Sequence, residues 1–284
     1  MTRTTVLALA ALGAVGLAGS ALAEASLERG TYLVQGPMGC GNCHTPIGPQ
    51  GPLMDQDLTG RVVEDSPAFR AVAPNITPAG RISGWSDAEL MKAIREGLRP
   101  DGSLIGPPMP IGQYRGLSDD DLASVVMYLR SLPATPSAAE LPASEYHIPL
   151  PPAYGPPVET VSAPPRGATA EYGAYLAGPV AHCLECHTPM GPQGIDATRL
   201  GAGGFEFHGP WGTSVAANLT SSEDGLAGYT DDQIATMITA GKRPDGSPMM
   251  PPMPYGYLAK MTPEDLQAVI LFLRTLPPQP DPKG

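Results

Sequence analysis

The 284-residue sequence predicts an all-α protein in which one helical unit occurs twice. Three observations support this prediction: helix start signals recur in both halves, apolar residues follow them at helical spacing, and the two halves align along most of their length. The chain also contains 34 glycines and 35 prolines, which favours long loops between short helices.

A capping box opens a predicted helix at the same place in each half. Ser86 is followed three residues later by Glu89, and Thr230 is followed by Gln233. In this arrangement each side chain satisfies a backbone donor of the first helical turn. Glycines end both helices, at Gly97 and Gly241.

The last predicted helix of each half begins at Ser118 or Thr262 and ends before a Leu-Pro pair. Its apolar residues recur at i, i+3, i+4 and i+7, which is one face of a helix. They are Leu122, Val125, Val126 and Leu129 in the first copy, and Leu266, Val269, Ile270 and Leu273 in the second. A further short helix is predicted over 27–34 and again over 170–177.

The repeat defines the predicted domain organisation. Matching blocks lie 143 or 144 residues apart and include Tyr32-Leu33 with Tyr175-Leu176, Ala73–Thr77 with Ala216–Thr220, and Arg99–Ser103 with Arg243–Ser247. We therefore expect one domain at 24–134 and a second at 168–278, followed by a tail at 279–284. Ten prolines between 133 and 167 predict an extended linker at 135–167.

All four cysteines lie in two copies of a C-x-x-C-H motif, Cys40 to His44 and Cys183 to His187. This motif is typical of covalent haem c attachment. Two thiols one helical turn apart add to the two vinyl groups of one haem, and the adjacent histidine ligates the iron. We predict two haem c groups, bound through Cys40, Cys43, His44, Cys183, Cys186 and His187.

Two other uses of the cysteines are less well supported. Two disulfides would suit an exported chain, but they do not require a histidine after each pair. A zinc site needs four ligands arranged around one ion, and a histidine adjacent to a cysteine rarely points at the same metal.

The second axial ligand of each iron is predicted from a proline-rich loop. Met109 lies in Pro107-Pro108-Met109-Pro110, and Met253 lies at the equivalent place in Pro251-Pro252-Met253-Pro254. Neighbouring prolines restrict the loop and reduce the entropy lost when a thioether is held at the iron. We expect Met91, Met127 and Met237 to fill gaps in the core instead. His147, His182 and His208 lack an equivalent in the other half, which favours surface positions or places beside the haem for them.

The first 23 residues resemble a signal peptide, with Arg3, an apolar run over 6–17 and Ala21-Leu22-Ala23 as the cleavage site. An uncleaved N-terminal anchor is the alternative. No later stretch approaches ~20 apolar residues, so no stable membrane span is expected in the mature chain. A periplasmic location is expected from the signal peptide. The formal charge of −11 argues against nucleic acid as a partner and favours a protein with a basic patch.

Several ordered motifs resemble those of the class I cytochrome c domains. They are C-x-x-C-H-T-P, Asn75-Ile76-Thr77, Gly84-Trp85-Ser86-Asp87, Arg-Pro-Asp-Gly-Ser and Pro-Met-Pro. The chain is most similar to the bacterial cytochrome c subunits that accept electrons from periplasmic alcohol, aldehyde and sugar-acid dehydrogenases. The resemblance implies His/Met ligation and terminal helices that cross beside the haem. This chain has two haem motifs where the best-known subunits carry three, and no C-terminal membrane-binding helix is expected.

These features predict a periplasmic dihaem electron carrier rather than an enzyme. Its expected redox partners are a dehydrogenase donor and a cytochrome or oxidase acceptor. The alternative is a dihaem enzyme, either a peroxidase or a thiosulfate-oxidising cytochrome. A peroxidase needs an open iron site, and the thiosulfate-oxidising enzymes use an additional cysteine. A haem subunit with a purely structural role is a third hypothesis.

Overall fold

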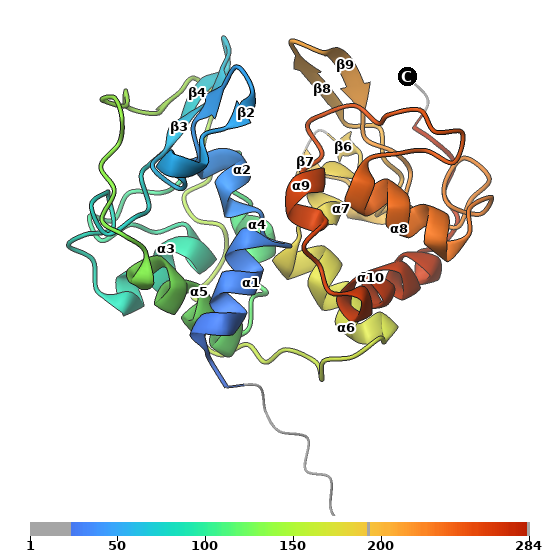
Figure 1. Ribbon diagram of the computed structural model, residues 1–284, viewed down its shortest axis with the longest axis horizontal. Coiled ribbons are helices and arrows are strands. Elements are labelled where there is room, and N and C mark those ends of the chain that lie inside the picture. The colour runs from blue at the N-terminus through green and yellow to red at the C-terminus, as the bar shows by residue number, and fades with distance from the viewer. Residues whose placement is uncertain (1–23, 192–193, 283–284) are drawn as a thin grey trace, which may run out of the picture.

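The computed structural model describes residues 24–191 and 194–282, and its elements lie in two halves side by side (Figure 1). The predicted signal peptide, its cleavage site, and residues 192–193 and 283–284 lie outside the described residues. Within the described part of the chain, no helix is both long enough and apolar enough to cross a bilayer.

Apart from one π-helical segment in the second half and one short strand after the first, the same order of elements occurs in both halves. The first contains α1 (Leu27–Gln35), α2 (Cys40–His44), β1 (Ile47–Gly48), β2 (Gly51–Pro52), η1 (Met54–Gln56), β3 (Arg61–Asp65), β4 (Phe69–Ala73), α3 (Asp87–Glu96), α4 (Ile111–Tyr114) and α5 (Asp119–Ser131). β5 (Glu145–Tyr146) follows. The second contains α6 (Ala170–Tyr175), η2 (Leu176–Val180), α7 (Cys183–Cys186), β6 (Met190–Gly191), β7 (Gly194–Ile195), η3 (Ala197–Arg199), β8 (Glu206–Gly209), β9 (Gly212–Val215), α8 (Asp231–Ala240), α9 (Tyr255–Leu258) and α10 (Pro263–Thr275).

The predicted helix signals are confirmed in both halves. Complete capping boxes open α3 and α8, and the left-handed residues Gly97 and Gly241 end them at φ 69° and 60°. Ser118 and Thr262 cap α5 and α10 by accepting hydrogen bonds from backbone N–H groups in the first turn. These local signals suffice because each satisfies backbone groups that a helix end leaves without partners.

The expectation of an all-α fold is wrong in one respect, because small antiparallel sheets accompany the helices. β3 pairs with β4, which also pairs with β5, and β1–β2, β6–β7 and β8–β9 form separate hairpins. Strands of two to five residues are too short for an alternating apolar pattern to distinguish them from loops. The described part of the protein is therefore helix-rich with some small sheets.

One close helix crossing forms the centre of each half. α1 packs on α5, and α6 packs on α10. At the crossings, a Cβ atom on Gly30 would overlap the carbonyl of Ser124, and one on Gly173 would overlap the carbonyl of Ala268. Glycine at these equivalent positions allows the backbones of the two helices to touch.

Reciprocal hydrogen bonds join the two halves along a seam. The Tyr32 hydroxyl donates to Asp265 at 2.6 Å, and the Tyr175 hydroxyl donates to Asp121 at 2.7 Å. Tyr32 and Tyr175 are equivalent in the repeat, as are the two carboxylates, so each half contributes the same contact to the other. One cluster of buried hydrophobic residues also extends through both halves. The halves therefore form one packed body.

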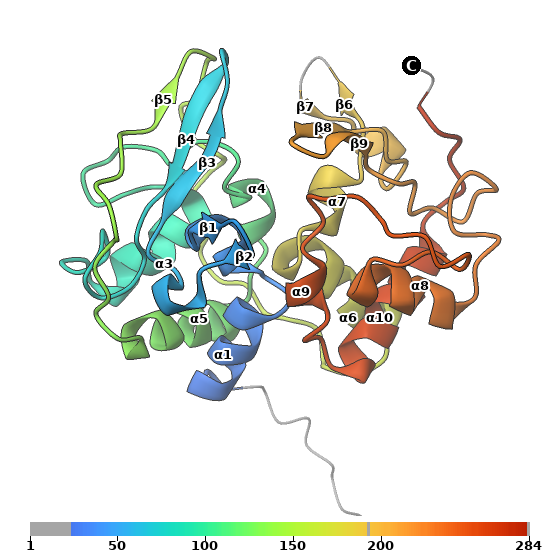
Figure 2. The same cartoon turned by 45° about the horizontal axis from the view of Figure 1, so that its top comes forward.

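The proline-rich segment 135–167 lies on the surface of the first half and contains no helix. Ser137 donates to the carbonyl of Thr59 at 2.7 Å, and Asp119 N–H donates to the carbonyl of Val161 at 2.9 Å. Between these points β5 adds a short strand to the β3–β4 hairpin (Figure 2). The segment is thus attached to the first half at several places.

Candidate haem-attachment sites

Each C-x-x-C-H motif forms a short helical turn, α2 in the first half and α7 in the second. A left-handed residue precedes each turn, Gly39 at φ 56° and His182 at φ 40°. All four cysteines are described, and all are half-buried free thiols. The disulfides considered as an alternative are therefore not formed in this structure.

Burial suppresses ionisation of the four thiols. It raises the pKa of Cys40 and Cys186 to about 12, that of Cys183 to about 11, and that of Cys43 in the same direction. A protonated thiol is a poor metal ligand and a poor nucleophile in disulfide exchange. Among the described residues, no group of three or more His, Cys, Asp or Glu side chains is arranged to hold a metal ion.

The two motif histidines have matching hydrogen bonds. His44 Nδ1 lies 2.8 Å from the carbonyl of Pro74, and His187 Nδ1 lies 2.7 Å from the carbonyl of Ala217. A carbonyl can only accept, so Nδ1 carries the proton and Nε2 keeps its lone pair. Burial also lowers the pKa of both imidazoles, which favours the neutral form. A neutral imidazole oriented through one nitrogen, with the other available, fits an axial ligand of iron.

Buried asparagines hold the segments that provide these carbonyls. The Asn75 side chain accepts from Thr77 N–H at 2.8 Å and donates to the carbonyl of Thr135 at 2.8 Å. Asn218 makes the same two contacts, with Thr220 at 2.9 Å and with the carbonyl of Gln279 at 2.8 Å. Both side chains are about 95% buried. The repeated Asn-x-Thr segments therefore act structurally rather than as accessible glycosylation sites.

The proline-rich loops occupy equivalent positions in the two halves. Met109 and Met253 lie two residues before the start of α4 and α9, and each is half-buried. Both pack against the central hydrophobic cluster, which Cys40 and Cys183 also contact. The Pro107-Pro108 and Pro251-Pro252 peptide bonds are both cis. Each half thus presents its loop methionine and its first motif cysteine to the same core.

The other candidate residues separate by exposure. Met91 and Met237 pack against the core as predicted, whereas Met127 is 44% exposed on α5, so its assignment as a core residue was wrong. His147 and His208 are exposed, as expected for surface residues. His182 instead lies at the seam between the halves. The helical periodicity of the sequence did not predict this position.

Each C-x-x-C-H turn, called the attachment turn below, contacts an aromatic side chain of the other half. The Tyr114 ring, from α4, lies edge-on to the His182 ring of the other half at 6.0 Å. Conversely, the Tyr257 ring, from α9, lies 3.6 Å from where a Cβ of Gly39 would be, and its hydroxyl would overlap a Cβ on Gly41. Figure 2 shows α9 beside the first half. Each half therefore covers part of the other's attachment turn.

The sequence repeat gave no indication of these aromatic contacts. Tyr114 aligns with Leu258, and Tyr257 aligns with Gln113. Because the tyrosines occupy different positions in the two copies, comparing the halves could not identify them.

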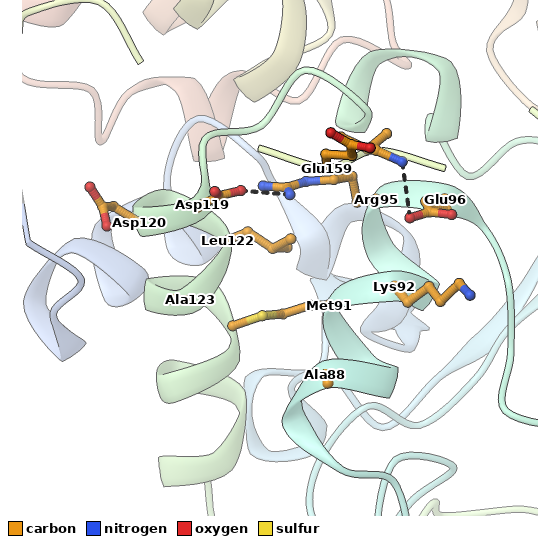
Figure 3. A pocket seen from close by; sticks show the side chains of 11 residues that line it. Ala88, Met91, Lys92, Arg95, Glu96, Asp119, Asp120, Leu122, Ala123 and Glu159 are labelled. Atoms are coloured by element: carbon orange, nitrogen blue, oxygen red, sulfur yellow. Dashed lines mark hydrogen bonds and ion pairs between the residues drawn. The ribbon is translucent and has the colours of Figure 1, made fainter. Parts of the chain in front are cut away.

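A cavity of about 580 Å³ lies away from these turns, between α3 and α5 (Figure 3). Arg95 borders it and pairs with Asp119 at 2.7 Å, while the Glu96 carboxylate accepts from Val158 N–H at 3.3 Å. The six residues of the two C-x-x-C-H motifs that are predicted to bind haem, and the two loop methionines, do not line this cavity.

No family model matches the chain. It is 29% identical over 289 residues to the alcohol dehydrogenase (quinone) cytochrome c subunit of Gluconobacter oxydans, with 92% of this chain and 57% of the relative aligned. It is 27% identical over 268 residues to the fructose dehydrogenase cytochrome subunit of Gluconobacter japonicus, with 89% of this chain and 53% of the relative aligned. The chain therefore spans less than two thirds of these relatives.

A shorter relative aligns over most of both chains. The diheme cytochrome c-type of Cereibacter sphaeroides is 30% identical over 263 residues, covering 84% of this chain and 82% of the relative. Covalent attachment of haem c agrees with the thiol and histidine geometry of the two turns. The chain belongs to the c-type cytochrome family that contains these dehydrogenase subunits and the Cereibacter sphaeroides diheme cytochrome.

Proposed function

We propose that this protein is a periplasmic dihaem c-type cytochrome that transfers single electrons between a dehydrogenase and a downstream cytochrome or oxidase. The observation that supports it most strongly is the duplicated attachment turn. In each copy two cysteines precede a histidine whose Nδ1 is held by a backbone carbonyl. The names of the relatives favour a dehydrogenase as the electron donor.

We further propose that 24–134 and 168–278 are tandem class I cytochrome c domains, joined by the linker 135–167. The repeated order of elements and the equivalent helix crossings of α1 on α5 and of α6 on α10 support this division. The seam then fixes one domain against the other.

In this proposal Cys40 and Cys43 attach one haem and Cys183 and Cys186 attach the second. His44 and His187 would be the proximal ligands of the two irons, and Met109 and Met253 would supply the second ligand of each. Bound haem supplies an iron that alternates between the ferric and ferrous states. The protein orients each imidazole, provides the thioether and excludes water. Because each attachment turn contacts the other half, electron exchange between the two haems within one chain is favoured.

Methionine ligation predicts a stepwise spectroscopic loss. We expect Met109→Ala and Met253→Ala each to remove about half of the sulfur-to-iron charge-transfer absorbance of the oxidised protein, since one of two thioether ligands is lost. The double variant should lose all of it. Absorption spectroscopy of the haem-loaded variants measures this loss. Met127→Ala is the matched control, because this exposed methionine should leave the band unchanged. An undiminished band in either ligand variant would refute that ligand.

The electron-carrier function is tested with natural partners. The protein is used to capture its binding partners from native periplasm. Stopped-flow mixing with each captured protein then measures which of them reduces the haems. We expect reduction by a dehydrogenase supplied with its own substrate, at a rate that falls with added salt because the chain carries a charge of −11. Carbon monoxide should bind poorly to the reduced protein. Rapid binding to one haem, together with peroxide turnover, would favour the dihaem enzyme instead.

A further inference from the structure

The loops before the two proposed methionine ligands differ in how they are covered. Gly106 is buried in the first loop, whereas the equivalent Met250 is 42% exposed in the second. The difference arises from segment 135–167, which crosses the first loop. The second loop is contacted by residues of its own half.

Tyr154 holds one end of the first loop. Its hydroxyl donates to the carbonyl of Ile105 at 2.8 Å, and its ring lies 3.0 Å from where a Cβ of Gly97 would be. Ile105 N–H in turn donates to the carbonyl of Gly97 at 2.7 Å. Tyr154 therefore fastens the start of the loop to the end of α3.

Tyr146 holds the other end of the loop. Its hydroxyl donates to the carbonyl of Pro107 at 2.8 Å, and its ring fills the space that a Cβ on Gly106 would need. The ring also stacks on Phe69, with centroids 5.7 Å apart, and β5 pairs with β4. Tyr146 is thus itself fixed to the β3–β4 hairpin, and it can restrain the loop beneath it.

We propose that Tyr146 and Tyr154 are positioning residues of the first haem site, which hold loop 105–108 closed and thereby keep Met109 at the iron. This inference rests on the proposed function, in which Met109 is the distal ligand. Prolines at 107 and 108 have no backbone N–H to donate, and the two tyrosines instead hold the loop through the carbonyls of Ile105 and Pro107. Burial raises the pKa of both phenols, so both remain hydrogen-bond donors at neutral pH.

The second site is restrained from within its own half. Ser214 Oγ donates to the carbonyl of Pro251 at 2.6 Å, and the Tyr255 hydroxyl donates to the carbonyl of Met250 at 3.3 Å. These residues provide controls for the effect of segment 135–167, because they act on the other loop.

The test uses the Met253→Ala variant with both haems attached, in which the charge-transfer band reports Met109 alone. Adding Tyr146→Phe or Tyr154→Phe should lower the equilibrium constant for the closed over the open loop about fivefold for each lost hydrogen bond. In a titration with imidazole, which competes with Met109 for the iron, the midpoint concentration for loss of the band then falls about fivefold per substitution. Cyanide should also bind the oxidised first haem about fivefold faster. Adding Ser214→Ala instead should change neither quantity.

The outcomes separate the two levels of the proposal. If the band is present in Met253→Ala and disappears in the double methionine variant, Met109 is the ligand. An unchanged midpoint and cyanide rate in both tyrosine variants would then overturn the positioning role alone. A band that survives loss of both methionines would overturn the ligand assignment, and the positioning role with it. Far-UV circular dichroism verifies that each variant is folded.

Discussion

Replacing Arg29 by Met is expected to reduce the free energy of unfolding by about 3–5 kcal/mol. Arg29 is 7% exposed, and its guanidinium makes two hydrogen bonds of 2.8 Å to Asp121. It also donates to the Tyr172 hydroxyl of the other half at 3.1 Å and lies 3.9 Å from Asp265. Removing the cation leaves Asp121 with weaker partners, the more exposed Arg166 at 3.6 Å and the Tyr175 hydroxyl at 2.7 Å. Urea unfolding of the haem-loaded protein, followed by far-UV circular dichroism, measures the loss.

The same substitution changes the acid stability. Burial by itself would raise the pKa of Asp121, but the hydrogen bonds and charge of Arg29 outweigh it and lower that pKa. The stabilisation is therefore fully present above about pH 3.9, the ordinary pKa of Asp, and is lost as the pH falls through the lower folded value. Without Arg29, burial is opposed only by the smaller effects of Tyr175 and Arg166, so the pKa of Asp121 rises above its value in the unchanged protein. We expect Arg29→Met to begin acid unfolding at a higher pH.

A surface pair provides the control for Arg29. Arg70 lies 3.2 Å from Asp65 with a side chain that is 34% exposed. Arg70→Met should change the free energy of unfolding by about 0–1 kcal/mol, because solvent screens an exposed pair. A loss below about 1 kcal/mol in Arg29→Met would contradict the assigned role of the buried pair.

The second large effect is expected at the helix crossings. Gly30→Ala and Gly173→Ala should each destabilise the protein by about 3 kcal/mol, because the added methyl group overlaps a backbone carbonyl of the facing helix. Alanine's better helix propensity, worth up to about 1 kcal/mol, offsets only part of this cost. Because the carbonyl belongs to helix backbone, the helices must move apart. Urea unfolding of both variants measures the change.

Two helical glycines without close neighbours serve as controls. At Gly112 in α4 and Gly256 in α9, an added Cβ atom would have no other atom within 4 Å beyond the adjoining chain. Alanine there should leave stability unchanged or raise it slightly, through helix propensity and a more restricted unfolded chain. If Gly30→Ala behaved like Gly112→Ala, the close approach of α1 and α5 would be contradicted.

Local signals predicted the helices well. The capping boxes at Ser86 and Thr230 and the C-terminal glycines act on neighbouring backbone groups, so their effect does not depend on tertiary structure. The short strands were missed because β5, for example, comprises only Glu145–Tyr146 and depends on pairing with distant β4. Hairpins of this kind are defined by contacts between segments rather than by a periodic pattern.

In the candidate site too, residues set by local spacing were predicted, whereas contacts between distant segments were not. The cysteines and histidines of the two motifs follow from spacing alone, because haem attachment fixes that spacing. The carbonyl partners of His44 and His187 lie 30 residues further along the chain, so spacing did not reveal them. Tyr146 and Tyr154 lie in a segment whose proline content indicated only extended chain. Their contacts, like those of the seam residues, depend on packing between distant parts of the chain.

The most direct test of the central claim is the pyridine haemochrome assay on purified protein of known concentration. Two thioether-linked haem groups per chain are predicted, one for each C-x-x-C-H turn. Cys43→Ala and Cys186→Ala should each alter the signal of one group and leave the other intact. One haem group or none per chain in the wild-type protein would contradict the account. So would a spectrum typical of haem with free vinyl groups.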